Sequence, residues 1–182
     1  MKSSTAASNS EPDIGQRLLA ELEALYRTAR YLTGDAALAE DLVQEVSLKV
    51  IQGQHTFRPE ADFRPWVFSI LRHTLTDYYR RQNVRPVTVS LEADGLDLPA
   101  DEPLDYRLFD YVLDEEIEQA LGELPFEMQL AVLLADIEEF SYREIAEVLE
   151  WPLGSVMSRL HRGRRKLRQR LLTYAKSRGY QL

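Results

Sequence analysis

Apolar residues recur along most of this chain at the spacing of one face of an α-helix, and no stretch alternates long enough to predict a sheet. The first stripe predicts a helix over residues 14–32, with Gly34 suited to end it and Asp35 suited to cap the next one. The second stripe predicts a helix that ends near Gly53. The stripes consist of Leu18, Leu22, Leu25, Ala29 and Leu32, and then of Leu38, Leu42, Val46 and Val50.

The helical period resumes after a polar loop over residues 54–64. Pro65 suits the first turn of a third helix that reaches about Gln82, because proline lacks the N–H that this turn leaves unpaired. Four further helices are predicted, over residues 114–124, 125–138, 141–149 and 154–178. The predicted fold class is therefore all-α.

Residues 84–113 interrupt the pattern. They contain Pro86, Pro99 and Pro103, and from residue 87 onward seven acidic residues stand against one arginine. This composition predicts a flexible acidic linker, with a short helix over 104–113 as an option. Because about 30 residues extend up to ~100 Å, the parts on either side need not touch. We therefore predict a disordered tail (1–13), a helical domain (14–83), this linker, and a second helical domain (114–182).

Charge is distributed unevenly along the chain. The formal net charge is −8, yet residues 151–182 hold nine basic residues and no acidic one. Residues 114–150 hold twelve acidic residues against the single Arg143. A basic end on an acidic protein indicates a local surface that binds a polyanion. The alternative is a solvated basic helix end that the helix dipole favours.

The most specific motif is SYREIAEVLEWPLGSVMSRLHRGRRKL, which predicts a helix-turn-helix. Ser141 and Glu144 have the spacing of a capping box, and Pro152 interrupts the helix after residue 149. On the second helix, one face is apolar and the other carries hydroxyl and basic groups. The apolar face comprises Val156, Leu160, Gly163, Leu167 and Leu171, and the polar face Ser155, Ser158, Arg162, Arg165 and Gln169, flanked by Arg159 and Lys166.

This arrangement is what entry into the DNA major groove requires, since a short helix braces a second one whose first turns reach the bases. We predict base contacts from Ser155, Ser158, Arg159 and Arg162, because arginine pairs with guanine and serine reaches several groups. The later basic run suits phosphate instead. That run consists of Arg164, Arg165, Lys166 and Arg168. The alternative is an amphipathic helix with a solvated basic face.

The third helix interleaves aromatic and basic residues, a pattern that suits single-stranded nucleic acid because rings stack on unpaired bases. The alternative is that the aromatic residues, Trp66 and Phe68 in particular, belong to the core and the arginines are solvated. The residues concerned are Trp66, Phe68, His73, Tyr78 and Tyr79 with Arg64, Arg72, Arg80 and Arg81.

EDLVQEVSLKV, followed by FRPEADFRPWVFSILRHTLTDYYRR and then by the helix-turn-helix, resembles the extracytoplasmic-function class of bacterial RNA polymerase sigma factors. The resemblance implies a subunit that binds core RNA polymerase and directs promoter recognition and strand opening. It also implies that the DLVQE block docks on the clamp helices of the polymerase beta-prime subunit. Leu42 fits the core of its helix, so the expected contacts are Asp41, Gln44 and Glu45.

The resemblance further implies that the loop over 56–63 and the following helix open the minus-ten element and hold an extruded base, while the helix-turn-helix reads the minus-thirty-five element. The expected minus-ten residues are Thr56, Phe57, Arg58, Phe63, Trp66, Arg72, His73 and Arg80. Many relatives carry Arg-Asn where this chain has Arg72 and His73, so its base preference is expected to differ. The acidic linker fits the family's path through the RNA exit channel.

The segment PLGSVMSRLHRGRRKLRQRLLTYAKSRGY is similar to the SigR/SigH-like oxidative-stress subgroup, which implies control by a thiol-bearing, zinc-binding anti-sigma factor. Since the chain has no cysteine, redox sensing is expected to reside in that partner. The competing function is a stand-alone helix-turn-helix regulator that binds duplex DNA without polymerase.

Catalysis is not expected. The only histidines, His55, His73 and His161, lack the spacing of metal ligands, and no phosphate-binding glycine loop is present. We therefore predict no catalytic residue, no metal and no cofactor. No apolar run approaches the length of a membrane-spanning helix, so a soluble cytoplasmic protein without membrane insertion is expected.

Overall fold

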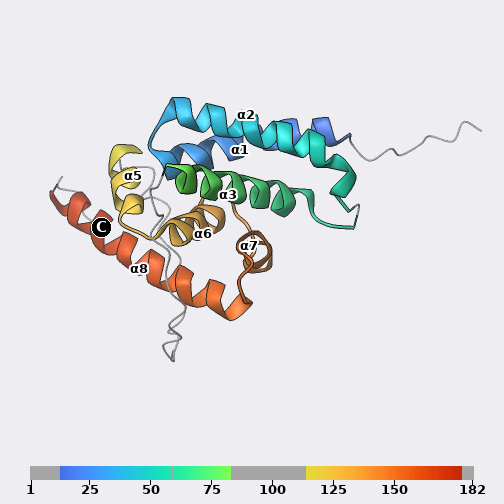
Figure 1. Ribbon diagram of the computed structural model, residues 1–182. Coiled ribbons are helices and arrows are strands. Elements are labelled where there is room, and N and C mark those ends of the chain that lie inside the picture. The colour runs from blue at the N-terminus through green and yellow to red at the C-terminus, as the bar shows by residue number, and fades with distance from the viewer. Residues whose placement is uncertain (1–12, 59, 83–113, 178–182) are drawn as a thin grey trace, which may run out of the picture.

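The computed structural model describes residues 13–58, 60–82 and 114–177 (Figure 1). Every regular element in these ranges is a helix, which confirms the predicted all-α class. No helix within them is long and apolar enough to cross a membrane. The predicted linker, the short helix over 104–113 and nearly all of the predicted tail lie outside the described residues.

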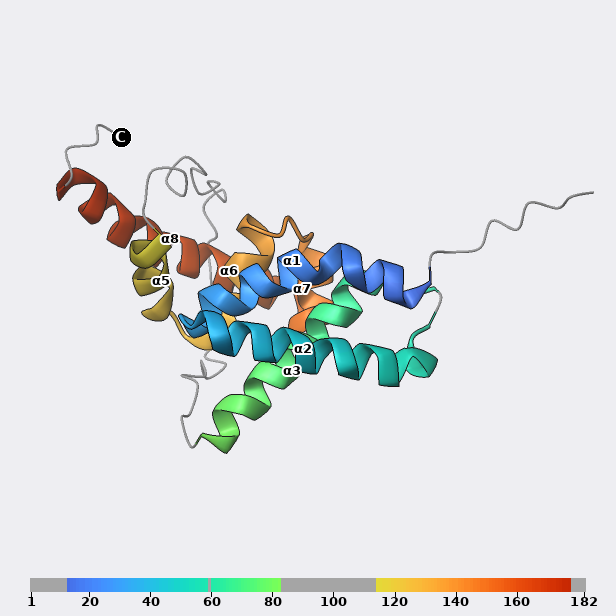
Figure 2. The ribbon, with the colours of Figure 1, turned by 90° about the horizontal axis from the view of Figure 1, so that it is seen from above.

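The N-terminal half consists of α1 (Ile14–Thr33), α2 (Ala36–Gly53), the short 3-10 helix η1 (Gln54–Thr56) and α3 (Phe63–Arg81). Gly34 ends α1 in the left-handed conformation at φ 67°, and the Asp35 carboxylate accepts a hydrogen bond from the Leu38 N–H at 3.1 Å. The tight joint read from the sequence is therefore confirmed. It directs α2 back along α1, as Figure 2 shows.

The third helix starts two residues earlier than expected, at Phe63 rather than Pro65. Pro65 then occupies the third helical position, where its missing N–H still removes no intrahelical hydrogen bond. Phe63 is buried and anchors this first turn against the core.

The C-terminal half consists of α5 (Asp114–Gly122), α6 (Phe126–Asp136), α7 (Tyr142–Leu149) and α8 (Leu153–Ser177). Nearly all residues of α6 are buried, which is the pattern of a helix surrounded by other elements. It packs against α8 on one side and α1 on another. It also ends at Asp136, earlier than expected.

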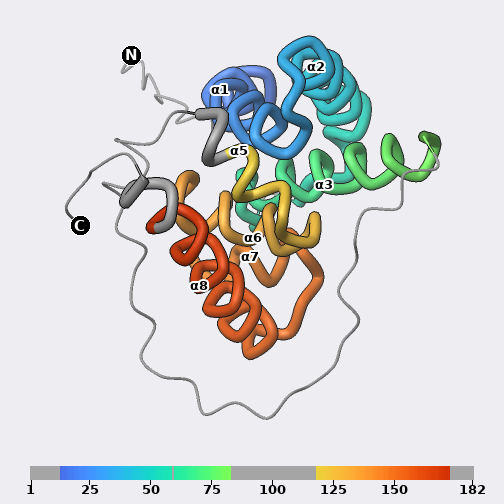
Figure 3. The backbone as a smooth tube through the Cα atoms, turned by 90° about the vertical axis from the view of Figure 1, so that its left-hand side faces the viewer, coloured from blue at the N-terminus to red at the C-terminus, as the bar shows by residue number. Residues whose placement is uncertain are grey.

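The two halves pack together and share one apolar core, as the layers in Figures 1 and 3 show. Phe68 on α3 lies edge-on to Phe140, with ring centroids 4.9 Å apart, and Tyr79 meets Phe126 in the same way at 5.6 Å. The length of the linker left open whether the halves touch, and in this structure they do. Apolar side chains on α3 and in the loop before α7 cover one another, so contact removes both from water.

Candidate nucleic-acid interface

The helix-turn-helix is built from α7, a turn and α8. The capping box at the start of α7 is present: the Glu144 N–H donates to the Ser141 hydroxyl at 3.3 Å, and the Ser141 N–H donates to the Glu144 carboxylate at 2.7 Å. Glu150 ends α7 in the left-handed conformation at φ 55°, a strained state for a residue with a side chain. The backbone reversal at Glu150, followed by Pro152, separates the two helices.

The two faces of α8 lie as the sequence predicts. The apolar residues of its inner face are buried, and Gly163 lets α8 approach α6 closely, because a Cβ there would lie 3.0 Å from side-chain atoms of Met128 and Val132. On the outer face Arg165 and Lys166 are exposed. Ser155, Ser158 and Arg162 are half-buried. A row of hydroxyl and basic groups therefore reaches solvent along the helix.

Arg159 does not belong to this row. It is only 4% exposed, and its guanidinium lies 4.0 Å from the centre of the Trp151 ring. Burial lowers the pKa of this arginine, as expected for a cation held away from water. Arg159 therefore packs on the turn in this structure, where we had expected a base contact.

Arg164, which we expected to face phosphate, lies inside the domain. Its guanidinium donates to both carboxylate oxygens of Asp136, at 2.8–3.2 Å, and to the Tyr142 hydroxyl at 3.1 Å. Burial opposes the charge of Arg164, but Asp136 outweighs that effect and raises its pKa. This side chain joins α6, α7 and α8, so its role here is to hold the helix-turn-helix together.

The expected minus-ten residues beyond the first turn of α3 fall into two groups along that helix. Trp66, His73 and Arg80 are spaced seven residues apart and therefore share one helix face. His73 and Arg80 are exposed on that face, and Trp66 is half-buried. Arg72 points elsewhere: its guanidinium donates to the Val148 carbonyl of α7 at 2.9 Å.

Phe57, in the loop before α3, forms an aromatic cluster with two residues of the first turn of α3. Phe57 lies 5.5 Å from Phe63 and 5.1 Å from Trp66, measured between ring centroids. The guanidinium of Arg17 lies over both phenylalanine rings, at 5.1 and 4.7 Å, a contact that the sequence analysis missed. Phe63 is only 5% exposed, so its ring belongs to the protein core and supports the loop from there.

At the edge of that cluster, Thr56 and Arg58 are exposed, and the Thr56 hydroxyl donates to the Gly53 carbonyl at 2.7 Å. Phe68, by contrast, is fully buried, which confirms the core interpretation for that residue.

The outer face of α2 carries the expected polymerase contacts. Asp41 and Gln44 are exposed, and Glu45 pairs with Lys49 at 2.8 Å. Leu42 is buried, as expected for a core position. Two apolar residues on this face escaped the sequence analysis: Leu48 is 61% exposed and Ile51 is 44% exposed. Both are apolar residues outside the core stripe of α2, and that position is the sequence signal by which they could be found.

Comparison with known proteins agrees with this geometry. Residues 18–85 match sigma-70 region 2, and residues 114–167 match sigma-70 region 4. RNA polymerase sigma factor YlaC of Bacillus subtilis is 33% identical over 151 residues, which cover 82% of this chain and 84% of that protein. ECF RNA polymerase sigma factor EcfG of Rhodopseudomonas palustris is 32% identical over 152 residues, 82% of this chain and 80% of that protein. The chain belongs to the extracytoplasmic-function class of RNA polymerase sigma factors.

Other relatives and solved structures support the same family. ECF RNA polymerase sigma factor SigE of Mycolicibacterium smegmatis is 36% identical over 152 residues, which are 83% of this sigma factor but only 58% of that longer protein. Among solved structures, sigma factor RpoE of Bartonella quintana, in complex with the anti-sigma factor NepR, superposes with a TM-score of 0.69 at 28% identity. That match covers 87% of this chain and 96% of the other. CnrH, in complex with the cytosolic domain of CnrY, shares the fold with a TM-score of 0.67 at 24% identity, over 92% of each chain.

Proposed function

We propose that this sigma factor binds core RNA polymerase through α2, opens the minus-ten element with its N-terminal half and reads the minus-thirty-five element with α8. The observation that carries the proposal is that α8 has two distinct faces, one apolar and one polar. Its apolar face is sealed against α6, α7 and α5, while hydroxyl and basic groups line the other face. The braced helix is thus free to enter a major groove.

In the minus-thirty-five interface we assign base contacts to Ser155, Ser158 and Arg162, and phosphate contacts to Arg165 and Lys166. The half-buried residues lie in the first turns of α8, where a recognition helix meets base edges. The exposed pair lies further along the helix, where long cationic side chains reach the backbone. We leave Arg159 out because it stacks on Trp151.

We expect Arg162→Ala to weaken binding to the matching promoter by about 1–3 kcal/mol and to relax base preference at one position. The matched control is Lys166→Ala, which should weaken binding equally on all sequences and reduce the salt slope by about one. Titration of promoter fragments with the reconstituted holoenzyme at several salt concentrations separates the two. Equal behaviour of both variants would contradict the assigned faces.

For the minus-ten element we assign strand contacts to the stripe of Trp66, His73 and Arg80, continued by Phe57 and Arg58 in the loop. Aromatic and cationic groups alternate on this surface, which suits unpaired bases and their backbone. Extruding a base costs a few kcal/mol of unstacking, and such contacts offset that cost. Thr56 and Phe63 position the loop.

We place the beta-prime clamp helices of the polymerase on the outer face of α2, against Asp41, Gln44 and Glu45. Carboxylate and amide groups around an exposed apolar strip suit a helical partner with basic and apolar residues. With these partners, we propose that the protein acts in the bacterial cytoplasm as an initiation factor and not as an enzyme. An anti-sigma factor is a further proposed partner, since the similar structure of RpoE contains one.

Run-off transcription tests this function. Core polymerase with the purified chain should initiate at discrete promoters, and the mapped start sites should share two elements about 25 base pairs apart. The competing function, a stand-alone regulator, leaves the N-terminal half without a role. Tight promoter binding by the isolated chain, together with no co-purification of polymerase, would favour that alternative.

A further inference from the structure

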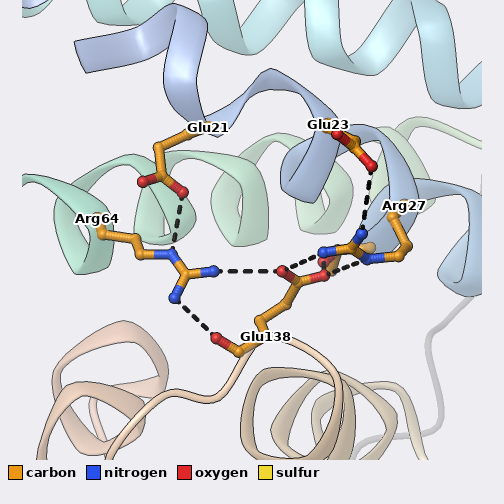
Figure 4. A network of polar contacts seen from close by, with 6 residues as sticks. Glu21, Glu23, Arg27, Arg64 and Glu138 are labelled. Atoms are coloured by element: carbon orange, nitrogen blue, oxygen red, sulfur yellow. Dashed lines mark hydrogen bonds and ion pairs between the residues drawn. The ribbon is translucent and has the colours of Figure 1, made fainter.

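Buried charges in the described part of the chain are paired, with one exception. Asp136 accepts hydrogen bonds from the guanidinium of Arg164 at 2.8–3.2 Å. Glu138, in the loop between α6 and α7, has a side chain that is 1% exposed and accepts hydrogen bonds from Arg27 at 2.9 Å and from Arg64 at 3.3 Å (Figure 4). Each of these charges is balanced by an opposite one, as burial away from water requires.

The exception is Arg159 of α8. It is 4% exposed, and its guanidinium lies over the Trp151 ring, 4.0 Å from the ring centre. No described residue forms a hydrogen bond or an ion pair with this guanidinium. None of its nitrogen atoms is sealed from solvent without a partner, so the edge of the group still reaches the surface. An aromatic ring thus holds one face of the cation, while the donors at its edge point to no acceptor in the described structure.

Trp151 itself is fixed in the turn before α8. Its N–H donates to the Ala146 carbonyl of α7 at 3.0 Å, and the carbonyl of Pro152, the next residue, accepts from the Ser155 N–H at 2.8 Å. The turn is therefore anchored to both helices, and the indole ring is half-buried. Side chains of a helix lean toward its N-terminus, so Arg159 meets this ring by folding back along α8. Trp151 gives Arg159 a fixed position that a solvated arginine lacks.

Arg159 stands on the flank of α8 and not at the middle of its outer face. Lys166 follows it by seven residues, so the two share one side of the helix. A helix in the major groove meets base edges with its central strip, and its flanks face the phosphates that border the groove. Lys166 already has a proposed phosphate contact, and Arg159 lies about two turns closer to the start of α8, beside the proposed base contact Ser158.

The charge of Arg159 is kept at a cost to folding. Burial lowers its pKa, the charge of Glu127 opposes this effect without an ion pair, and Arg162 adds to it. Arg164 is buried as well, but Asp136 more than compensates and raises its pKa. A cation buried without a carboxylate, yet with an open edge, is placed to receive an anion from outside the protein.

We infer that Trp151 and Arg159 form a preset phosphate contact: the indole ring holds the guanidinium in place, and the open edge donates to one backbone phosphate of the minus-thirty-five duplex. Arg159 binds the phosphate, and Trp151 is its positioning residue. The contact fixes the register of α8 and carries no base information of its own. This inference rests on the proposed function, because it assumes that α8 enters a major groove.

The first test compares the free full-length chain with its Arg159→Met variant on duplex DNA of random sequence. Methionine keeps an apolar stem over Trp151 and removes the charge. Loss of one phosphate contact should reduce the slope of log affinity against log salt concentration by about one. The matched control is Arg170→Met, which should leave the slope unchanged because Arg170 is paired with Glu123 at 2.6 Å.

A second measurement excludes a purely structural role. Because the buried charge is unfavourable to folding, Arg159→Met should unfold at the same urea concentration as the parent or at a higher one. Arg159→Gln provides a second neutral variant. Earlier unfolding of both variants, with an unchanged salt slope, would show that the stack is structural and contradict the inference.

The third test locates the phosphate. Promoter fragments with a single neutral methylphosphonate, placed in turn along the minus-thirty-five element, are titrated with the reconstituted holoenzyme. The parent should lose affinity at one position where holoenzyme with Arg159→Met is insensitive, while both respond alike at the other positions.

Substitutions of Trp151 test the positioning. Trp151→Ala keeps the charge of Arg159 but lets its side chain move, so binding should weaken about threefold to tenfold at an unchanged salt slope. Trp151→Phe keeps an aromatic ring and should bind nearly as tightly as the parent. Equal affinity of these two variants would refute the role of Trp151.

Equal salt slopes for the parent and folded Arg159→Met, or a methylphosphonate profile that the substitution leaves unchanged, would refute the phosphate contact. A parent that binds no duplex even at low salt would refute it as well. If the free chain binds duplex through Arg159 while the holoenzyme selects no promoter, the proposed function fails and the phosphate contact stands.

Discussion

Asp136→Ala should destabilise the protein by about 3–5 kcal/mol, because it leaves the guanidinium of Arg164 buried without its carboxylate. Arg164 is 9% exposed and donates three hydrogen bonds to Asp136, so water cannot replace the lost partner without opening α6, α7 and α8. Urea denaturation followed by circular dichroism measures the change. The loss exceeds what most single substitutions cause.

The matched control is Arg165→Ala, which removes an exposed arginine from the next position of α8. A surface change of this kind should stay within about 0.5 kcal/mol of the parent. Replacing Asp136 and Arg164 together by apolar residues should recover much of the stability, since a well-packed apolar substitute for a buried ion pair is often neutral. Equal stability of Asp136→Ala and Arg165→Ala would contradict the bracing role.

Leu48→Asp should weaken binding to core polymerase by about 2 kcal/mol or more, roughly 30-fold, as for an apolar residue at the centre of an interface. Leu48 is 61% exposed on the face of α2 that we propose as the docking face, so the substitution should remove apolar contact with the partner and hardly disturb the core. Competition for labelled core enzyme measures the affinity.

Leu19→Asp serves as the control for Leu48→Asp. Leu19 is 68% exposed on α1, outside the docking face, and its replacement should leave polymerase binding unchanged. If both variants bind core polymerase like the parent, the proposed contact between the polymerase and this face of α2 is wrong. If both lose binding, the docking face extends over α1.

Local features of the fold were predictable because short-range chemistry determines them. The Gly34–Asp35 joint and the Ser141–Glu144 capping box depend on residues within four positions of each other, and both form as predicted. The buried and polar faces of α8 also follow from the helical period. Arg164 and Arg159 did not follow it, because their long side chains fold back onto Asp136 and Trp151. The helical period predicts the direction in which a Cβ atom points, but it does not predict where the guanidinium of a long arginine side chain lies.

The contact between the two halves could not be predicted from the sequence. Glu138 and Phe140 stand in a short loop, where an acidic and an aromatic residue suggest no partner, and their contacts lie across residues 83–113. The left-handed conformation of Glu139, without glycine or asparagine, gives no signal in the sequence either. Long-range packing of this kind depends on shape complementarity that no local pattern encodes.

The order of synthesis adds a consequence to this long-range pairing. Phe140 follows Phe68 by 72 residues, an interval of about 4–14 s at 5–20 residues per second. During that time the nascent N-terminal helices leave the ribosome with an uncovered apolar patch, and Arg27 and Arg64 lack the contact with Glu138. Slow translation thus prolongs the period in which chaperones, or other growing chains, find that patch first.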